Sequence, residues 1–246
     1  MVKTWVLITT ALLSAGAAMA EEGEIALLPS GADIKDTESL QRGARNFMNY
    51  CSGCHSLKYL RYNRLAADLK IPETELAGTL MFTSNKVFDT VNSAMPADSE
   101  SWFGKQPPDL SLISRAKGVD YPYSFLKGFY ADKTRPWGVN NLYLASAAMP
   151  HVLEHLQGMQ KPVFKNEPDA HGSARMVLVG VDSMTPGALK PEEYDQFVRD
   201  IANFLDYAGE PVKEKRQSLG VFVTLFLLVF FLFAYLLKKE YWKDVH

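Results

Sequence analysis

The sequence predicts a mainly α-helical domain followed by one C-terminal transmembrane helix. Residues 40–51 and 191–208 have the apolar spacing of amphipathic helices, and residues 219–237 contain no charged side chain. Between the two amphipathic segments the chain alternates short apolar runs with proline and glycine, which favours long loops. We therefore expect a helical core with long loop insertions, attached to a membrane at its C-terminal end.

The first 20 residues have the features of a secretory signal peptide. Lys3 provides a positive start, an apolar run covers residues 5–13, and Ala18-Met19-Ala20 fits a cleavage site. A retained anchor is the alternative, but this run is shorter than the roughly 20 residues that a spanning helix needs. We expect cleavage after Ala20 and an exported domain over residues 21–212.

Residues 219–237 are expected to cross the membrane once. At 1.5 Å per residue this segment spans about 28 Å, close to the thickness of a bilayer core. A buried core helix is the alternative, and apolar side chains on every face disfavour it. Residues 213–218 would then be a juxtamembrane linker and residues 238–246 a tail inside the cell.

The charge of the chain excludes little beyond nucleic acid. With 26 basic and 28 acidic residues the formal net charge is −2. Proteins that bind nucleic acid need clustered positive charge, so no nucleic-acid partner is expected.

An amphipathic helix leads into the two cysteines of the chain. Asp36 or Thr37 offers an N-cap for it. The apolar residues at helical spacing are Leu40, Ala44, Phe47, Met48 and Cys51. These residues lie on one face of the expected helix.

Both cysteines lie in the motif Cys51-Ser-Gly-Cys54-His55. The pattern C-x-x-C-H is the attachment signal of c-type haem. On a helix its three functional residues occupy positions i, i+3 and i+4 and project to one side. A redox-active dithiol is the alternative, but such pairs usually follow a strand. We expect one covalent haem c on Cys51 and Cys54, with His55 as an axial iron ligand.

The second axial ligand decides the reaction class. An open iron site performs chemistry, whereas an iron closed by a methionine thioether carries electrons. The methionines that closely precede a proline are Met95, Met149 and Met184. The local pattern leaves these three candidates open.

Four segments together resemble the cytochrome c1 family, the haem subunit of the bacterial type of cytochrome bc1 complex. They are the haem motif extended to Tyr59, Pro107-Pro-Asp-Leu-Ser-Leu-Ile113 with Arg115-Ala, Tyr121-x-Tyr-Ser-Phe-Leu-Lys-Gly-Phe-Tyr130, and Asn141-Leu-Tyr-Leu-Ala-Ser-Ala-Ala-Met149-Pro-His-Val-Leu. The resemblance covers almost all of the mature chain, in the right order.

The resemblance implies roles for individual residues. Met149 would be the second axial ligand, and Arg115 and Tyr121 would lie near the haem propionates, which need a cation and a hydroxyl donor. A solvated charge at a helix end is the alternative for Arg115. Pro108 would shape the wall beside His55, because consecutive prolines fix an extended backbone.

The resemblance also implies a function, a cytochrome c-type haem domain that passes single electrons from the Rieske iron–sulfur protein to a cytochrome c. Cytochrome b and the Rieske protein would be partners in a dimeric ubiquinol–cytochrome c reductase, and the chain would contribute no catalytic residue of its own. The domain would lie on the periplasmic side of a bacterial inner membrane. The alternatives are a free-standing, membrane-anchored cytochrome c shuttle and a haem enzyme with an open iron site.

The remaining patterns are weaker. His151-Val-Leu-Glu-His155 fits a zinc-peptidase motif, but five-residue patterns are common by chance. Short helices are expected over 61–70 and 84–93, helices after a proline-rich turn within 107–131, a loop over 132–150 and a strand over 175–181. From the expected fold we also predict that Phe47 and Met48 face Phe204 and Leu205.

Overall fold

The computed structural model describes residues 25–168 and 174–243; the expected signal peptide lies outside the described residues. The elements in chain order are α2 (Thr37–Tyr50), β1 (Leu57–Arg61), α3 (Tyr62–Asp68), α4 (Glu73–Thr79), β2 (Thr90–Val91), the 3-10 turn η1 (Ala97–Ser99), α5 (Glu100–Phe103), α6 (Ile113–Lys117), α7 (Asp120–Lys127), β3 (Phe129–Ala131), β4 (Val139–Asn141), α8 (Glu154–Gln157), β5 (Gln160–Pro168), β6 (Ala174–Ser183), α9 (Pro191–Gly209) and α10 (Lys213–Tyr241).

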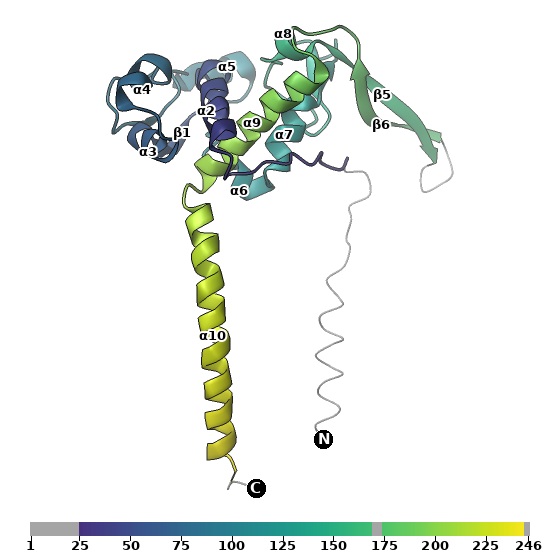
Figure 1. Ribbon diagram of the computed structural model, residues 1–246. Coiled ribbons are helices and arrows are strands. Elements are labelled where there is room, and N and C mark those ends of the chain that lie inside the picture. Colours follow the sequence, from purple (N-terminus) through teal and green to yellow (C-terminus); the bar gives the residue numbers. More distant parts are fainter. Residues whose placement is uncertain (1–24, 169–173, 244–246) are drawn as a thin grey trace.

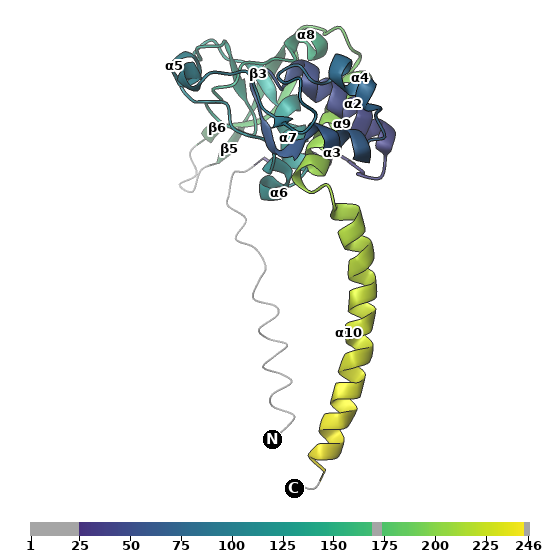
Figure 2. The ribbon, with the colours of Figure 1, turned by 90° about the vertical axis from the view of Figure 1, so that its left-hand side faces the viewer.

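Helices α2 and α9 lie side by side at the centre of the domain, with the short elements arranged around them (Figure 1). The described strands form three separate two-stranded antiparallel sheets, β1–β2, β3–β4 and β5–β6. The β5–β6 hairpin projects from one side of the domain, and α10 extends away from it as a single rod (Figure 2). The domain is therefore mainly helical, as the sequence predicts.

The predicted contact between the two long helices is present. The rings of Phe47 and Phe204 have centroids 5.7 Å apart, and Met48 and Leu205 belong to the same buried core. The helices approach most closely at Gly43, where an added Cβ would lie 2.0 Å from the Asp200 carbonyl oxygen. Only glycine fits this crossing, so Gly43 fixes the distance between the two helices.

A buried carboxylate connects the same two helices. Asp200 of α9 is 3% exposed, and it accepts hydrogen bonds from Ser39 Oγ at 2.7 Å and from Arg42 Nε at 2.6 Å. A carboxylate in a core is tolerated when it is paired and hydrogen-bonded. These contacts fix the register of α2 against α9.

The segment before α2 crosses the domain as an extended strap held by side chains. Leu28 N donates to Ser124 Oγ at 2.8 Å, and Ser30 N donates to Asp120 Oδ1 at 2.7 Å. Arg199 Nε of α9 donates to the Ser30 carbonyl oxygen at 2.9 Å. The strap therefore joins α7 to α9 without forming a helix or a strand.

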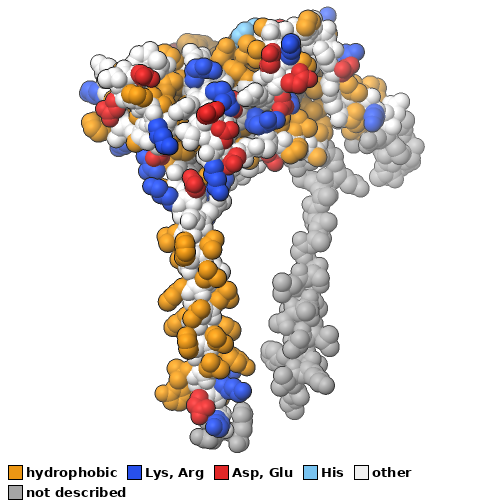
Figure 3. Space-filling view, viewed as in Figure 1, with side chains coloured by type: hydrophobic (Ala, Val, Ile, Leu, Met, Phe, Trp, Pro, Cys, Tyr) orange, Lys and Arg blue, Asp and Glu red, His pale blue; other side chains and the backbone are white. Residues whose placement is uncertain are grey.

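The last helix is long and apolar enough to cross a membrane. It has 29 residues and none is buried against the domain. Hydrophobic side chains cover its visible face between charged groups at its two ends (Figure 3). Residues 213–218, expected as a linker, form its first turns.

The structure corrects several sequence expectations. The helix expected over 84–93 is wrong, because Ser84 Oγ bonds Asp89 Oδ2 at 2.6 Å and accepts from Lys86 N at 3.1 Å. Such local side-chain bonds compete with helix formation. The expected helix at 61–70 is present as α3, and the strand at 175–181 as β6, but β1, α4 and β5 were missed. Residues 132–150 are a loop except for β4, which pairs with β3.

Candidate haem-binding site

The C-x-x-C-H motif lies in the turn that follows α2, and not on the helix itself. Helix α2 ends at Tyr50, yet His55 N donates to the Cys51 carbonyl oxygen at 2.8 Å. This bond has the i→i−4 spacing of one more helical turn. The motif therefore keeps its side chains together although the expected helix stops before it.

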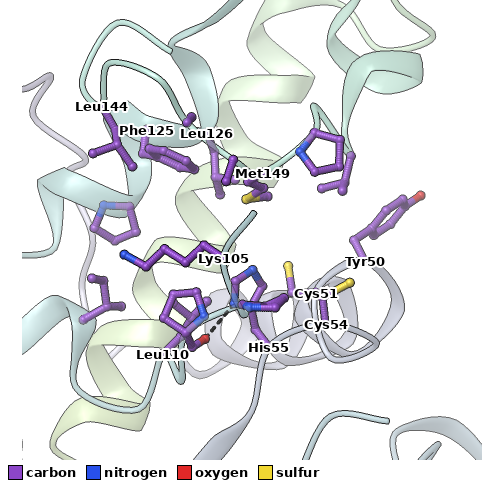
Figure 4. Close-up of a pocket in the computed structure, with 18 of the residues that line it drawn as sticks. Tyr50, Cys51, Cys54, His55, Lys105, Leu110, Phe125, Leu126, Leu144 and Met149 are labelled. Atoms are coloured by element: carbon purple, nitrogen blue, oxygen red, sulfur yellow. Dashed lines mark hydrogen bonds between the residues drawn. The ribbon is translucent and has the colours of Figure 1, made fainter. Parts of the chain in front are cut away.

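The imidazole of His55 is oriented by a backbone carbonyl. His55 Nδ1 lies 2.8 Å from the Pro108 oxygen, the bond drawn as a dashed line in Figure 4. A carbonyl oxygen only accepts, so Nδ1 carries the hydrogen and Nε2 keeps its lone pair. Burial lowers the pKa of His55 against the raising effects of the Pro108 carbonyl and Asp109. A neutral imidazole oriented in this way is the form that binds metals.

The two thiols are unlike those of a redox-active dithiol. Both cysteines are free; Cys51 is buried and Cys54 is partly exposed. Burial raises the pKa of Cys51 to about 12 and also raises the pKa of Cys54. Reactive C-x-x-C pairs have a lowered thiol pKa. The environment therefore disfavours the dithiol alternative.

Cys51, Cys54 and His55 line one side of an apolar pocket, and Met149 lies across it (Figure 4). The space between the walls and at the mouth is about 1260 Å³. Apolar side chains that line it include Phe125 and Leu126 from α7, Ile201 and Leu205 from α9, and Leu144.

The three candidate methionines are separated in space. Met149 lines this pocket and packs against the core. Met95 lies in a different, polar groove beside Pro107 and Pro108, and Met184 is 53% exposed. Of the three, only Met149 lines the pocket that His55 lines.

The other predicted residues divide between the pocket and its surroundings. Pro108 and Tyr121 line the pocket. Arg115 does not; its Nη1 lies 3.4 Å from Glu210 Oε2, and its side chain is 55% exposed. Lys105 lines the pocket and was missed, because nothing in the pattern of its loop distinguishes it from other surface lysines.

The H-x-x-E-H residues have structural surroundings. The His151 ring stacks on Phe129 with centroids 4.7 Å apart, and the His155 ring stacks on Tyr50 at 5.7 Å. Burial lowers the pKa of His151 to about 4. In the described part of the chain no three His, Cys, Asp or Glu side chains gather as a metal site. The zinc-peptidase pattern therefore has no structural support there.

Comparison with known proteins identifies the family of this pocket. Residues 32–245 match the model of the cytochrome c1 family. The chain belongs to the cytochrome c1 family. The cytochrome c1 of Allochromatium vinosum is 50% identical over 242 residues, which cover 98% of each chain. The ammonia monooxygenase gamma subunit of Nitrosomonas europaea is 42% identical, over 98% of this chain and 97% of that one. The cytochrome c1 of Rhodospirillum rubrum is 29% identical, over 94% and 92%.

Proteins of the cytochrome c1 family carry one covalent haem c, and the pocket fits this group. It brings together two free thiols, a neutral imidazole with one ring nitrogen available, and a thioether on the opposite side. The family makes the chain the electron-transfer subunit of the cytochrome bc1 complex, anchored to a membrane.

Proposed function

We propose that the chain passes single electrons through an iron bound between His55 and Met149, with the haem attached to Cys51 and Cys54. The observation that carries this proposal is the position of Met149 across the apolar pocket from His55. When bound, the haem supplies the one-electron couple of its iron. With His55 and Met149 both holding the iron, no position on it would remain for a substrate, which disfavours the alternative of a haem enzyme with an open iron site.

The residues around the pocket set the conditions for this transfer. The Pro108 carbonyl holds the His55 ring in one orientation, and the apolar wall from α7 and α9 excludes water. A dry surrounding and a thioether ligand both favour the less charged, reduced centre. Tyr121 lines the pocket, and its hydroxyl would donate a hydrogen bond to a propionate. For Arg115 the propionate role stays a prediction.

We further propose the partners and the location of the chain. Cytochrome b and a Rieske iron–sulfur protein would share a dimeric complex with it, and a cytochrome c would accept its electrons. Residues 21–212 would form the exported domain on the periplasmic side of a bacterial inner membrane, with the span at 219–237 and the tail at 238–246 inside. The apolar C-terminal helix and the family's membership of the bc1 complex support this arrangement.

Purification tests the complex against a free-standing shuttle. With an affinity tag after His246, we expect mild detergent extracts to yield the chain together with cytochrome b and a Rieske protein in equal amounts. The preparation should reduce added cytochrome c with a quinol as donor. Recovery of the tagged chain alone, with its haem and without quinol oxidation, would favour the shuttle.

Removing the anchor should release a folded haem domain. A stop codon after Ser218 removes the apolar span but keeps the pairs of Lys213 with Asp206 and of Arg216 with Glu210. Because no residue of α10 is buried, the domain core loses no contact. We expect a soluble periplasmic protein with the haem spectrum of the full chain, measured after cell fractionation. A haem-free or aggregated product would show that the domain needs α10 to fold.

A further inference from the structure

The pocket has one cationic side chain among the residues that line it, Lys105. In Figure 4 this side chain extends between the levels of His55 and Met149. The rest of the lining is mainly apolar. A positive charge therefore lies at the border of a pocket whose other side chains are mainly apolar and provide little stabilisation for an anion.

A haem brings two propionate carboxylates into this environment. A carboxylate beside an apolar wall loses hydration, and a cation or hydrogen-bond donor must replace it. Charge-assisted bonds between an ammonium and a carboxylate are among the stronger hydrogen bonds in proteins. A free cation at the pocket would meet this need.

The neighbouring cations already have partners. Arg115 is paired with Glu210 at 3.4 Å and does not line the pocket. Lys127 is paired with Asp195. The Lys117 ammonium lies 4.1 Å from the centroid of the Tyr121 ring, a cation–π contact.

Lys105, in contrast, has no carboxylate partner among the described residues. Among the described residues no carboxylate oxygen lies within 4.0 Å of its ammonium, since none of the ion pairs there includes it. Its backbone follows Gly104, whose φ of +73° ends α5, and precedes Pro107 and Pro108. Lys105 lies three residues before Pro108, whose carbonyl oxygen accepts from His55 Nδ1, and its side chain is exposed.

We propose that Lys105 binds one propionate of the haem and that its charge favours the reduced state of the site. Reduction adds one negative charge to the site, and a nearby cation stabilises that added charge. The side chain lies at the pocket edge once the macrocycle fills the space, and its ammonium donates to the carboxylate. This role is independent of which residue binds the iron opposite His55.

The reduced-to-oxidised ratio of the purified complex tests the proposal. At the midpoint potential of the wild type and low ionic strength, Lys105→Gln and Lys105→Met are each expected to lower this ratio roughly threefold or more. Lys105→Arg keeps the charge and should retain the wild-type ratio. The loss in the neutral variants should shrink at high salt, because the Debye length falls to about 3 Å at 1 M.

Three matched variants define the controls. Lys86→Gln removes an exposed lysine that does not line the pocket and should leave the ratio unchanged. Lys117→Gln and Arg115→Gln remove the competing cations. Covalent haem per chain, measured on denatured protein, should be equal in all variants. Unchanged ratios in both neutral Lys105 variants, or a fall confined to Lys117→Gln or Arg115→Gln, would overturn the proposal.

Discussion

Replacing Met149 by leucine is expected to lower quinol–cytochrome c reductase activity at least about tenfold while the haem remains attached. The thioether bonds at Cys51 and Cys54 do not involve Met149, so covalent attachment is unaffected. Loss of the thioether ligand lowers the potential, because the axial ligands set haem potentials over a range of about 0.8 V. Each 59 mV changes a one-electron equilibrium tenfold, so we expect activity to fall by about tenfold or more. Redox titration and the weak red absorption band of an iron–thioether bond measure the change.

Met95→Leu is the matched control for this experiment. Met95 also precedes a proline, but it lies in the polar groove outside the pocket. The Met95→Leu variant should keep the redox potential, the red absorption band and the activity of the wild type. If Met95→Leu lowered the potential and Met149→Leu did not, the ligand assignment would be wrong.

Replacing Gly43 by alanine is expected to destabilise the domain strongly. The new Cβ would lie 2.0 Å from the Asp200 carbonyl oxygen and 2.7 Å from the Phe204 Cβ, so α2 and α9 must separate. Overpacking of this kind costs about 1–3 kcal/mol or more, which outweighs the gain of about 1 kcal/mol that alanine brings to a helix. A net loss of roughly 2 kcal/mol corresponds to a melting temperature lower by about 4–8 °C. Loss of the haem absorption band on heating, at one fixed scan rate, measures it.

Gly78→Ala gives the comparison. Gly78 is also within a helix, but nothing lies within 4 Å of the position its Cβ would take. Here only the helix propensity changes, so the melting temperature should stay constant or rise. Equal melting temperatures in both variants would contradict the close approach of α2 and α9 at Gly43.

The parts of the site that the sequence predicts are those set by local pattern. Cys51 and His55 are four residues apart in the sequence, and the apolar spacing of the residues before them predicts the helix. The contact of Phe47 with Phe204 is confirmed, but it was predicted from the expected fold, because the spacing of the two apolar faces does not show that they pair. The spacing of residues in the sequence does not identify the second axial ligand of the iron. Three methionines have similar neighbours in sequence, and the tertiary fold distinguishes Met149 by bringing it into the pocket.

The remainder depends on contacts that no local pattern records. Lys105 enters the pocket because a loop between Gly104 and Pro107 carries it there. Strand β5 was missed because Pro162 and the charged residues Lys161, Lys165 and Glu167 interrupt the apolar alternation that identifies a strand. The helix expected over 84–93 is absent, because side-chain hydrogen bonds of Ser84 stabilise a turn there.

The packing of α2 on α9 has a consequence for the biogenesis of the protein. Cys51 belongs to the buried core to which α9 contributes, yet α9 ends roughly 150 residues after Cys54. At the pace of synthesis, about 5–20 residues per second, an interval on the order of ten to thirty seconds separates them. Over this interval the core around Cys51 is incomplete, because the side chains that α9 contributes to it have not yet been added. The long separation of the two helices therefore delays completion of the core around Cys51 until nearly the whole domain has been synthesised.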